Sequence, residues 1–419
     1  MSKVDVVVSC PIDTYSGYGA RARDFVKALD KNKYNVKVLA QRWGNTRFGY
    51  LEDHGENELQ SMIVPQLTER PDIWIQITVP NEFQAIGKYN IGVTAGIETT
   101  ICDPSWVQGV NKMDLTLVSS EHAKTTFLNS RFDVENKGQK QGQLTVQKPI
   151  EVLFEGADLS KYLVTESNFD LSAIKEDFAF LFVGHWLQGN FGEDRKNVGY
   201  MIKAFLEVFK NKKKQPALIL KTQSANASIM DRDAILKKIE DIRKTVKGKL
   251  PNIYIIHGEM SDEEINHLYN HDKVKAMVSF TKGEGFGRPL LEFSLVNKPI
   301  IASAWSGQTD YLSPEFTYAV RGSLQNVHSS AAMKNMILEQ AEWFKPDDGD
   351  AGTALRVVYE NYKKYAELAK RQGYRSRTEF SFEKMAERLD EILSSNVPEF
   401  PKQVELKLPK LELPKLQKL

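Results

Sequence analysis

One stretch constrains the fold more than any other: residues 276–312, AMVSFTKGEGFGRPLLEFSLVNKPIIASAWSGQTDYL. It predicts a short buried strand at 276–280, a glycine-rich turn, a helix that begins at Arg288-Pro289, and a second apolar strand at 299–303. Proline suits the first turn of a helix because its missing N–H would have no partner there. The stretch is therefore a βαβ unit, and a chain that contains one is expected to build a parallel sheet covered by helices.

The turn of this unit is a candidate ligand site. Gly283, Gly285 and Gly287 let the backbone approach a ligand closely, and the helix start directs free N–H groups at it. Glu284 lies in the turn and Glu292 on the helix behind it, so we expect the two carboxylates to bracket one anionic or hydroxyl-rich ligand. An ordinary loop with a solvated glutamate on each flank would have the same residues, and this alternative stays open here.

Short apolar strands and helices alternate along the rest of the chain, which predicts a doubly wound parallel sheet. Further strands are expected at 4–9, 36–40, 73–79, 91–95, 115–119, 150–154, 178–183, 217–221 and 253–256. Helices are expected at 120–129, 198–209, 231–246, 262–269, from about 328 to 372, and at 382–393. The polar, glycine-containing residues 134–148 predict a surface loop or hairpin.

A chain of 419 residues is too long for one ordinary core. Residues 159–176 have mixed polar composition without a clear period, so we place a domain boundary there. We expect an N-terminal domain at 1–170, a C-terminal domain at 171–380, a C-terminal helix at 381–396 that packs back on the N-terminal domain, and a low-complexity tail at 397–419. The predicted class is α/β, with two facing Rossmann-like domains and a ligand in the cleft.

The N-terminal domain offers its own candidate residues. Gly17 and Gly19 lie at the turn between the first strand and the first helix, but the third glycine of a dinucleotide-binding fingerprint is missing. Glu98 lies just past a predicted strand end, where open sheets hold ligands. It could equally be an ordinary turn or capping carboxylate.

Two cations mark the start of a helix in the C-terminal domain. Arg195 and Lys196 come directly before the helix predicted at 198–209. Their charges and the free backbone N–H groups of the helix start converge on one place, and a diphosphate is the ligand that suits it. A surface Arg-Lys pair at a helix start is the alternative.

The central stretch resembles a known family. Glu284-Gly-Phe-Gly-Arg-Pro-Leu-Leu-Glu292, followed by Lys298-Pro-Ile-Ile-Ala-Ser303, is similar to the E-x7-E signature of retaining GT-B glycosyltransferases of the family-four type, the glycosyl transferases group 1. Residues 256–269, IHGEMSDEEINHLY, resemble the segment that precedes this signature. The resemblance covers most of residues 177–320 well and the N-terminal half loosely.

The resemblance implies roles for residues of the C-terminal domain. Lys196 would contact the phosphates of a nucleotide-diphosphate sugar, with Arg195 assisting. Glu284 would hold hydroxyls of the donor sugar, and Glu292 would bind the ribose hydroxyls of the nucleotide. Glu284 and Lys196 are therefore the expected catalytic residues.

The remaining roles concern backbone groups and the other domain. Amides around Gly285, Phe286 and Gly287 would contact the sugar and the distal phosphate. Gly17 and Gly19 match the loop that approaches the diphosphate when the cleft closes. Glu98 aligns with an acid that some relatives have before a Pro-x-x-Trp-like stretch, here Pro104-Ser-Trp106, which puts it on the acceptor side.

The chain departs from the family pattern in two places. The family usually has arginine after the glycine that ends the first strand of the C-terminal domain, whereas this chain has Gly184-His185 and an insertion before Arg195. Either His185 or Arg195 takes the place of that arginine. The histidine that many members use near the donor sugar has no match. These departures leave the phosphate-binding geometry and the identity of the sugar open.

The implied reaction is transfer of a sugar with retention of anomeric configuration. Cations and N–H dipoles would stabilise the diphosphate leaving group, and domain closure would exclude water. The sequence has no Asp-x-Asp motif placed to bind a metal ion, so we expect no metal and no cofactor other than the donor substrate.

Composition limits the partners. The net charge is +1, and residues 1–160 contain 17 Lys and Arg against 20 Asp and Glu, so the N-terminal half lacks the basic excess that duplex binding needs. A local patch around Lys137, Lys140 and Lys148 would escape this count. No apolar run approaches the roughly 20 residues of a membrane span, and two cysteines give no disulfide framework, so a cytoplasmic location is expected. The oligomeric state stays undetermined.

Several acceptors and two other functions remain open. A glycan, a lipid-linked sugar or a small molecule would supply the acceptor hydroxyl, and modified bases of nucleic acid are a less favoured alternative. A non-catalytic protein that binds a nucleotide sugar or a glycan would retain the same fold, and the absence of arginine at position 185 favours it. An epimerase of the same architecture would need further acids and a histidine around the sugar.

Overall fold

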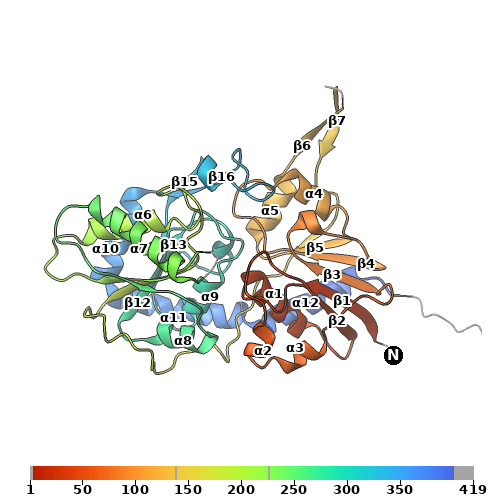
Figure 1. The fold of residues 1–419 in the computed structure, drawn as a ribbon, viewed down its shortest axis with the longest axis horizontal. Coiled ribbons are helices and arrows are strands. Elements are labelled where there is room, and N and C mark those ends of the chain that lie inside the picture. Colours follow the sequence, from red (N-terminus) through yellow and green to blue (C-terminus); the bar gives the residue numbers. More distant parts are fainter. Residues whose placement is uncertain (1–2, 137–138, 225–226, 401–419) are drawn as a thin grey trace, which may run out of the picture.

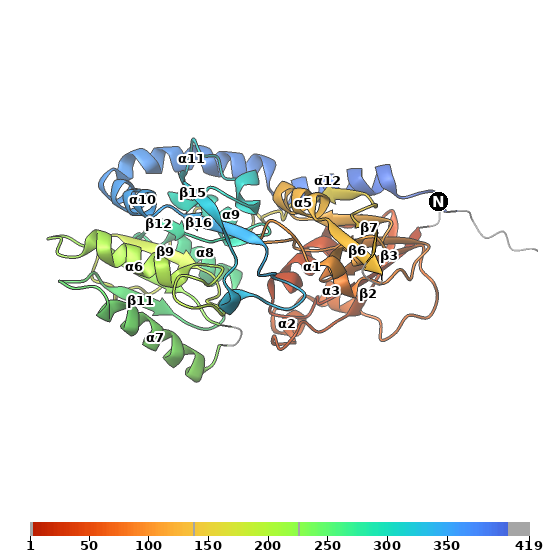
Figure 2. The same cartoon turned by 90° about the horizontal axis from the view of Figure 1, so that it is seen from above.

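The structure is a computed structural model that describes residues 3–136, 139–224 and 227–400. Within these residues, two six-stranded parallel sheets form two domains that lie side by side along the long axis of the molecule (Figure 1). Helices cover both faces of each sheet, as the view from above shows (Figure 2). The doubly wound α/β class predicted from the alternation of strands and helices is confirmed.

The N-terminal sheet has the strand order β2-β1-β3-β4-β5-β8. Its strands are β1 (Val4–Cys10), β2 (Tyr34–Ala40), β3 (Ile73–Ile77), β4 (Tyr89–Val93), β5 (Leu115–Val118) and β8 (Ile150–Val152). Its helices are α1 (Gly17–Ala28), α2 (Tyr50–Asp53), α3 (Asn57–Ser61), α4 (Pro104–Val110) and α5 (Glu121–Asn129), with the 3₁₀ turn η1 (Pro80–Glu82). The hairpin predicted at 134–148 is confirmed as β6 (Phe132–Asn136) and β7 (Gln139–Leu144), which extend away from the domain (Figure 1).

The C-terminal sheet has the order β11-β10-β9-β12-β13-β14. Its strands are β9 (Ala179–Val183), β10 (Ala217–Lys221), β11 (Ile253–Ile256), β12 (Val274–Ser279), β13 (Ile300–Ser303) and β14 (Tyr318–Val320). Its helices are α6 (Val198–Phe209), α7 (Ile229–Lys244), α8 (Asp262–Asn270), α9 (Arg288–Ser294), α10 (Asp348–Glu360) and α11 (Tyr362–Glu379). The 3₁₀ turn η2 (Gly307–Asp310) follows β13.

Three helix starts position the residues of interest. Ser16 caps α1, because its Oγ accepts a hydrogen bond from the amide of Gly19 at 2.9 Å. Asn197 precedes α6 in the left-handed conformation, with φ of 56°, and Gly287 precedes α9 with φ of 89°. Each start follows the carboxyl end of a parallel strand, so all three are at the edge of a sheet where ligands bind.

The chain crosses between the domains twice, at adjacent points. Residues 153–178 lead from β8 to β9, and residues 380–381 lead from α11 to α12 (Phe382–Asn396). The two crossings pair with each other: Ala157 N donates to Phe380 O at 2.9 Å, and Phe382 N donates to Ala157 O at 2.8 Å. A side chain at Gly156 would overlap the backbone of Ser381, so only glycine allows the crossings to lie this close.

Helix α12 packs back on the N-terminal domain, as predicted. Its buried face, Met385, Leu389, Ile392 and Leu393, belongs to the same apolar cluster as strands β1 and β3 and helix α1. The boundary expected near residue 170 falls in the segment between the sheets, where Tyr162, Leu171 and Ile174 pack into the core of the C-terminal domain. The tail from residue 401 onward lies outside the described residues.

The helix predicted from about 328 to 372 is wrong in its first part. A hairpin of β15 (Gly322–Asn326) and β16 (Glu342–Pro346) occupies this region, with the 3₁₀ turn η3 (Ser329–Ala331) in its loop, and α10 begins only at Asp348. The apolar residues of this region surround buried Trp343 instead of forming a helix face. Asn335 has φ of 63°, a left-handed turn that a helix would not contain.

Candidate functional site

Arg195 and Lys196 meet Glu284 at the cleft between the domains. Arg195 Nη1 donates to Glu284 Oε2 at 3.1 Å and to Gly283 O at 2.9 Å, while Lys196 Nζ donates to Glu284 Oε1 at 2.6 Å. The amide of Lys282 donates to Arg195 O at 2.8 Å, and this bond holds the loop before α6 against the turn after β12. The structure therefore joins one predicted acid and both predicted cations in one cluster.

Burial makes this cluster strongly electrostatic. The Glu284 side chain is only 8% exposed. Burial alone would raise the pKa of Glu284, but Lys196 and then Arg195 outweigh it and hold that pKa below its usual value. Burial would also lower the pKa of Arg195, yet Glu98 and Glu284 raise it. Glu284 thus stays ionised as the counter-charge of two cations, which a buried cation pair requires.

Glu98 reaches the same cluster from the N-terminal domain. Its Oε1 is 3.7 Å from Arg195 Nη1. Burial raises its pKa, while Arg195 opposes that shift. Glu98 is therefore not the capping carboxylate that the sequence left open, because it faces the cations across the cleft.

The glycine turn after β12 packs directly on N-terminal backbone. A Cβ on Gly283 would overlap the carbonyl oxygen of Glu98, and one on Gly285 would overlap that of Ala95. Ser119 Oγ donates both to Ala95 O and, at 3.0 Å, to Gly285 O. In this closed arrangement the absence of side chains at Gly283 and Gly285 serves contact between domains.

Phe286 and Gly287 complete the turn in different ways. The Phe286 ring is buried in the C-terminal core, with its centroid 4.9 Å from that of Tyr311. Tyr311 donates its hydroxyl to Gly287 O at 2.6 Å, which fixes the turn just before α9. The Phe286 side chain therefore points into the core, and contact of the amides of this turn with a donor stays a prediction.

Glu292 lies in a separate interdomain cavity of about 240 Å³. Gly17, Asp24 and Tyr15 line it from the N-terminal domain, and Arg288 and Glu292 line it from the C-terminal domain. None of Arg195, Lys196 and Glu284 lines this cavity. Of the two glutamates of the signature, Glu292 lines this cavity, whereas Glu284 pairs with the two cations.

An ion-pair chain spans this cavity. Arg288 Nε donates to Glu292 Oε1 at 2.7 Å, and Arg288 Nη1 donates to Asp24 Oδ2 at 2.5 Å in the other domain. Burial raises the pKa of Glu292 to about 7, although Arg288 opposes the shift. Glu292 can therefore exchange a proton near neutral pH.

Gly19 and Gly17 differ in position. Gly19 is buried, and a Cβ there would overlap Thr14 O, so it allows α1 to pack against the preceding loop. Gly17 has open space around its Cβ position and lines the cavity with Glu292. Of the two, only Gly17 faces a space that a ligand could occupy.

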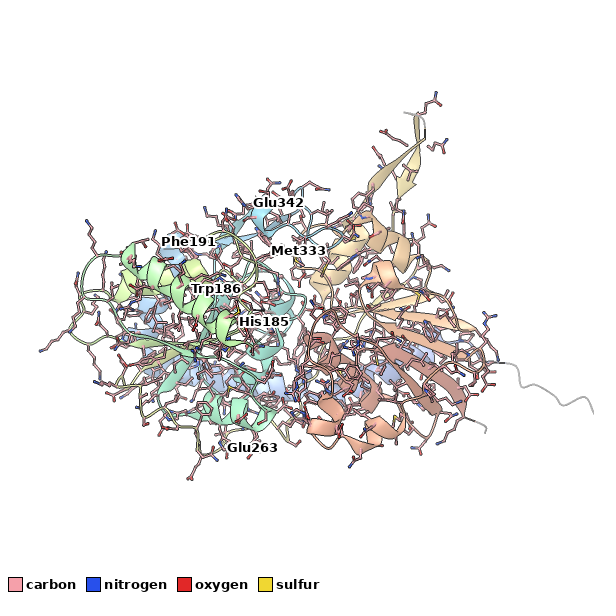
Figure 3. All side chains as sticks on the ribbon, viewed as in Figure 1. His185, Trp186, Phe191, Glu263, Met333 and Glu342 are labelled. Atoms are coloured by element: carbon pink, nitrogen blue, oxygen red, sulfur yellow. The ribbon has the colours of Figure 1, made fainter. Side chains whose placement is uncertain are left out.

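His185 lies on the side of the C-terminal domain that faces the cleft (Figure 3). Its Nδ1 is 2.9 Å from Ser224 O. Although the residue is exposed, partial desolvation of the ring lowers its pKa, and the nearby Lys196 and Arg195 lower it further. Of the two candidates for the family arginine, Arg195 is the one that contacts Glu284. Which of them binds phosphate stays a prediction.

The sequence interpretation gave no role to four residues that the structure brings to the cleft: Asp24, Ser119, Glu155 and Arg288. Arg288 lies four residues before Glu292 on a helix, a spacing that predicts side-chain contact, so a signal was present. Asp24 has no such signal, because its partner lies in the other domain. Glu155 is 9% exposed, and its pKa is raised by burial against the opposing effect of Arg21 and Arg288.

The described residues contain neither a metal-binding cluster nor a membrane-spanning helix. Over 3–136, 139–224 and 227–400, no group of three or more histidine, cysteine, aspartate or glutamate side chains is arranged to hold a metal ion. No helix in that same part of the chain is long and apolar enough to cross a membrane. Lys137 and the side chain of Lys140 lie outside the described part, and Lys148 Nζ is 3.9 Å from Asp114 Oδ1.

One family model matches most of the C-terminal domain. Residues 166–341 match the family model of glycosyl transferases group 1. No curated protein sequence is significantly similar to the chain. The resemblance inferred from the segment 284–303 is therefore confirmed for this domain.

Solved structures share the fold of the whole chain. Anabaena HepE in complex with UDP-glucose is 14% identical, with a TM-score of 0.62 over 94% of this chain and 100% of its own. A glycosyltransferase from Rickettsia africae is 11% identical, with a TM-score of 0.63 over 94% and 99%. Sucrose-phosphate synthase from Thermosynechococcus elongatus is 11% identical, with a TM-score of 0.61 over 94% and 99%. The GT-B arrangement of two facing Rossmann-like domains is confirmed.

Proposed function

From the premise that residues 166–341 form a glycosyl transferases group 1 domain, we propose that the chain moves a sugar from a nucleotide-diphosphate sugar to a hydroxyl acceptor. The observation that supports this most directly is the contact of Arg195 and Lys196 with Glu284 at the interdomain cleft. Two buried cations beside helix starts are what a diphosphate needs for binding.

Donor binding would exchange the partners of these cations. Buried cations require a counter-charge, and Glu284 supplies it in the structure. When the donor enters, its phosphate oxygens would replace Glu284 as the hydrogen-bond acceptors of Lys196 and Arg195. The Glu284 carboxylate would then accept hydrogen bonds from hydroxyls of the donor sugar, the role that the resemblance implies.

The cavity lined by Glu292 would hold the nucleoside. Glu292 and Gly17 line a cavity next to the cation cluster, and a carboxylate that is a hydrogen-bond acceptor suits ribose hydroxyls. Arg288 would keep its bond to Asp24 while Glu292 turns to the ribose. In this arrangement one donor molecule would extend from the cation cluster into this cavity.

The reaction follows from this placement. The bond between the anomeric carbon and the phosphate oxygen breaks, the diphosphate takes up negative charge, and Lys196 and Arg195 stabilise it. With retention, the acceptor oxygen attacks the face that the diphosphate leaves, and the acceptor proton passes to the departing phosphate oxygen. Glu98, opposite Arg195, would orient the acceptor hydroxyl from the N-terminal side.

The acceptor class follows from the charge of the N-terminal domain. Residues 1–160 contain 17 cationic against 20 anionic side chains, which favours a glycan, a lipid-linked sugar or a small molecule over nucleic acid. We further propose that the reaction is metal-independent and takes place in the cytoplasm. Turnover that is unchanged by EDTA would support the first point, and turnover lost with EDTA and restored by a divalent ion would overturn it.

The test uses a panel of UDP, GDP and ADP sugars, beginning with UDP-glucose, and measures release of the nucleotide diphosphate. Lys196→Ala and Glu284→Gln should each lower turnover by about a hundredfold or more. Lys210→Ala is the matched control, because that lysine lies at the far end of α6 and, among the described residues, forms an ion pair with Glu207 alone. Unchanged turnover in both site variants would refute the assignment. Tight binding without turnover would indicate the non-catalytic protein, and an epimerised sugar the epimerase.

A further inference from the structure

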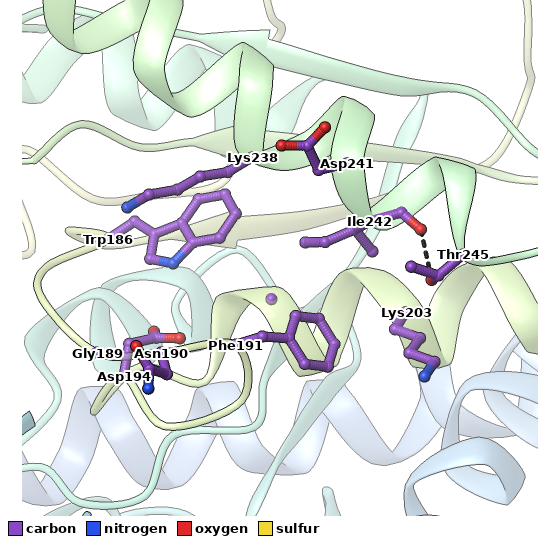
Figure 4. Close-up of a pocket in the computed structure, with 11 residues that line it drawn as sticks. Trp186, Gly189, Asn190, Phe191, Asp194, Lys203, Lys238, Asp241, Ile242 and Thr245 are labelled. Carbon is purple, nitrogen blue, oxygen red and sulfur yellow. Dashed lines mark hydrogen bonds between the residues drawn. The ribbon is translucent and has the colours of Figure 1, made fainter. Parts of the chain in front are cut away.

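The loop between β9 and α6 has a second face, away from Glu284. Residues 184–197 present Arg195 and Lys196 to the cleft, while Trp186 and Phe191 line a cavity of about 380 Å³ together with helices α6 and α7. The close-up shows the Trp186 indole, the Phe191 ring and Ile242 around the same space (Figure 4). No residue of the proposed donor site lines it.

Two polar groups in the wall of this cavity have unused hydrogen-bonding capacity. Trp186 is 5% exposed, its indole nitrogen lies on the side of the ring toward Phe191 (Figure 4), and within the described residues this N–H has no partner. Asp194 is 1% exposed, and its Oδ2 accepts from Val198 N at 3.1 Å. A carboxylate has more lone pairs than this hydrogen bond uses, so Asp194 retains capacity to accept another. An indole N–H without a partner, beside a carboxylate with remaining acceptor capacity, favours a ligand that both accepts and donates hydrogen bonds.

The charges around the cavity exclude a simple anion site. Lys238 and Lys203 line it, but Asp194 and Asp241 balance them. Each ammonium lies over an aromatic face: Lys238 Nζ is 5.1 Å from the centroid of Trp186, and Lys203 Nζ is 5.6 Å from that of Phe191. The cavity therefore has no net charge and suits a neutral ligand.

The shape of the wall narrows the ligand class. Phe191 is 55% exposed, an unusual position for a large apolar ring. Gly199 lies beneath it, and a Cβ there would come within 3.2 Å of the ring. A flat apolar ring beside a hydrogen-bond donor and a carboxylate matches a pyranose, which has apolar C–H faces and a hydroxyl rim.

We propose that this cavity, formed by Trp186, Phe191 and Asp194 with helices α6 and α7, binds one pyranose unit of a neutral glycan, separately from the donor cleft. The C–H face of the sugar stacks on Phe191. One hydroxyl accepts from the Trp186 indole N–H, and another donates to Asp194. The site is independent of the proposed transferase activity, because its residues contact neither Glu284 nor Glu292.

The test follows the indole N–H resonance of Trp186 in the ¹⁵N-labelled full chain, identified by its loss in Trp186→Phe. Methyl α-D-glucopyranoside, methyl α-D-mannopyranoside and N-acetylglucosamine are titrated separately, and sorbitol is the polyol control. We expect at least one pyranoside to shift the resonance with a Kd on the order of 1 mM, the affinity typical of so small a ligand. Phe191→Ala should weaken binding at least tenfold.

The matched control is Phe48→Ala. Phe48 is also an exposed phenylalanine, at 41%, with a cation over its ring, Arg42 at 5.4 Å, but it lies in the N-terminal domain. It should leave the titration unchanged. No shift with any pyranoside, an equal shift with sorbitol, or an unchanged shift in Phe191→Ala would overturn the proposal. A shift produced by inorganic phosphate would instead indicate an anion site and would also overturn it.

Discussion

The two domains use the same local device, a glycine-containing turn between a strand and a helix, for different purposes. In the N-terminal turn, Gly19 packs against the loop of its own domain and Gly17 opens into the cavity. In the C-terminal turn, Gly283 and Gly285 press against the backbone of the other domain. The N-terminal turn therefore forms part of the cavity wall, whereas the C-terminal turn forms part of the contact between the domains.

This difference separates two kinds of consequence. A side chain added to the C-terminal turn has to push the N-terminal domain away, which costs domain closure but leaves each domain folded. A side chain added at Gly19 has to distort the domain that contains it, which costs folding free energy. Glycines in similar motifs should therefore differ in whether substitution lowers activity or stability.

The largest effect is expected for Gly285→Val. Its side chain would overlap Ala95 O, so the cleft could not close on a donor. We expect kcat/KM for the donor to fall on the order of a thousandfold, about 4 kcal/mol of transition-state stabilisation, because closure positions the reacting groups. Thermal denaturation should show little change. A variant with normal turnover, or one that loses most of its Tm, would contradict the assignment of this glycine to the contact between the domains.

The next effect concerns the pH dependence of stability. Burial raises the pKa of Glu292 to about 7, so the folded protein retains a proton that the unfolded chain releases near its ordinary value of about 4.3. The folded state binds more protons in this window, so the free energy of unfolding falls as pH rises, by about 2.5 kcal/mol between pH 5 and pH 8.

Glu292→Gln tests this by keeping an oxygen for Arg288 while removing the titrating proton. Urea denaturation of the variant should show a curve flatter by about that amount. Glu263→Gln, at an exposed glutamate of α8, is the control and should leave the slope unchanged. An equally steep curve in Glu292→Gln would show that another group titrates.

Gly19→Ala sharpens the comparison from the N-terminal side. Its methyl group would overlap Thr14 O inside one domain, and overpacking of this kind costs about 2 kcal/mol of folding free energy. Chemical denaturation measures the loss, while kcat per folded molecule should change little. A normal free energy of unfolding combined with strongly reduced kcat would reverse the roles of the two turns.

The smallest effect is expected for Gly17→Ala. Nothing lies within 4 Å of its Cβ position, and it is the first residue of α1, so the free energy of unfolding should change by less than about 0.5 kcal/mol. Because the new methyl group enters the cavity beside Glu292, KM for the donor should rise while Tm stays constant. A destabilised variant, or an unchanged KM, would show that Gly17 does not form part of the cavity wall.

Much of the fold could be predicted from the sequence, because strands and helix starts depend on local patterns. The helix at Arg288-Pro289 and the apolar strands next to it appear where the pattern places them. The helix expected from about 328 failed for a tertiary reason. The apolar residues there pack around Trp343, and the sequence does not reveal that the chain turns back at Asn335.

The site could be predicted less completely than the fold. The sequence indicates candidate site residues after the ends of strands, among them Glu284, Arg195 and Lys196. Their ion pairing could not be predicted, because it depends on how two distant segments fold together. Asp24 shows the limit most clearly, because its partner Arg288 lies 264 residues away in the other domain. A contact between two domains produces no periodic pattern in the sequence of either segment, so sequence analysis cannot detect it.

The paired crossings at Ala157 and Ser381 restrict how the molecule can open. The two covalent connections between the domains run side by side, so they can act together as a single hinge. We therefore expect the two halves to swing apart about the crossings. The domains should then separate most at the points farthest from the crossings. There Thr100 and Glu342 form two hydrogen bonds between the domains, and we expect these to break first as a substrate enters.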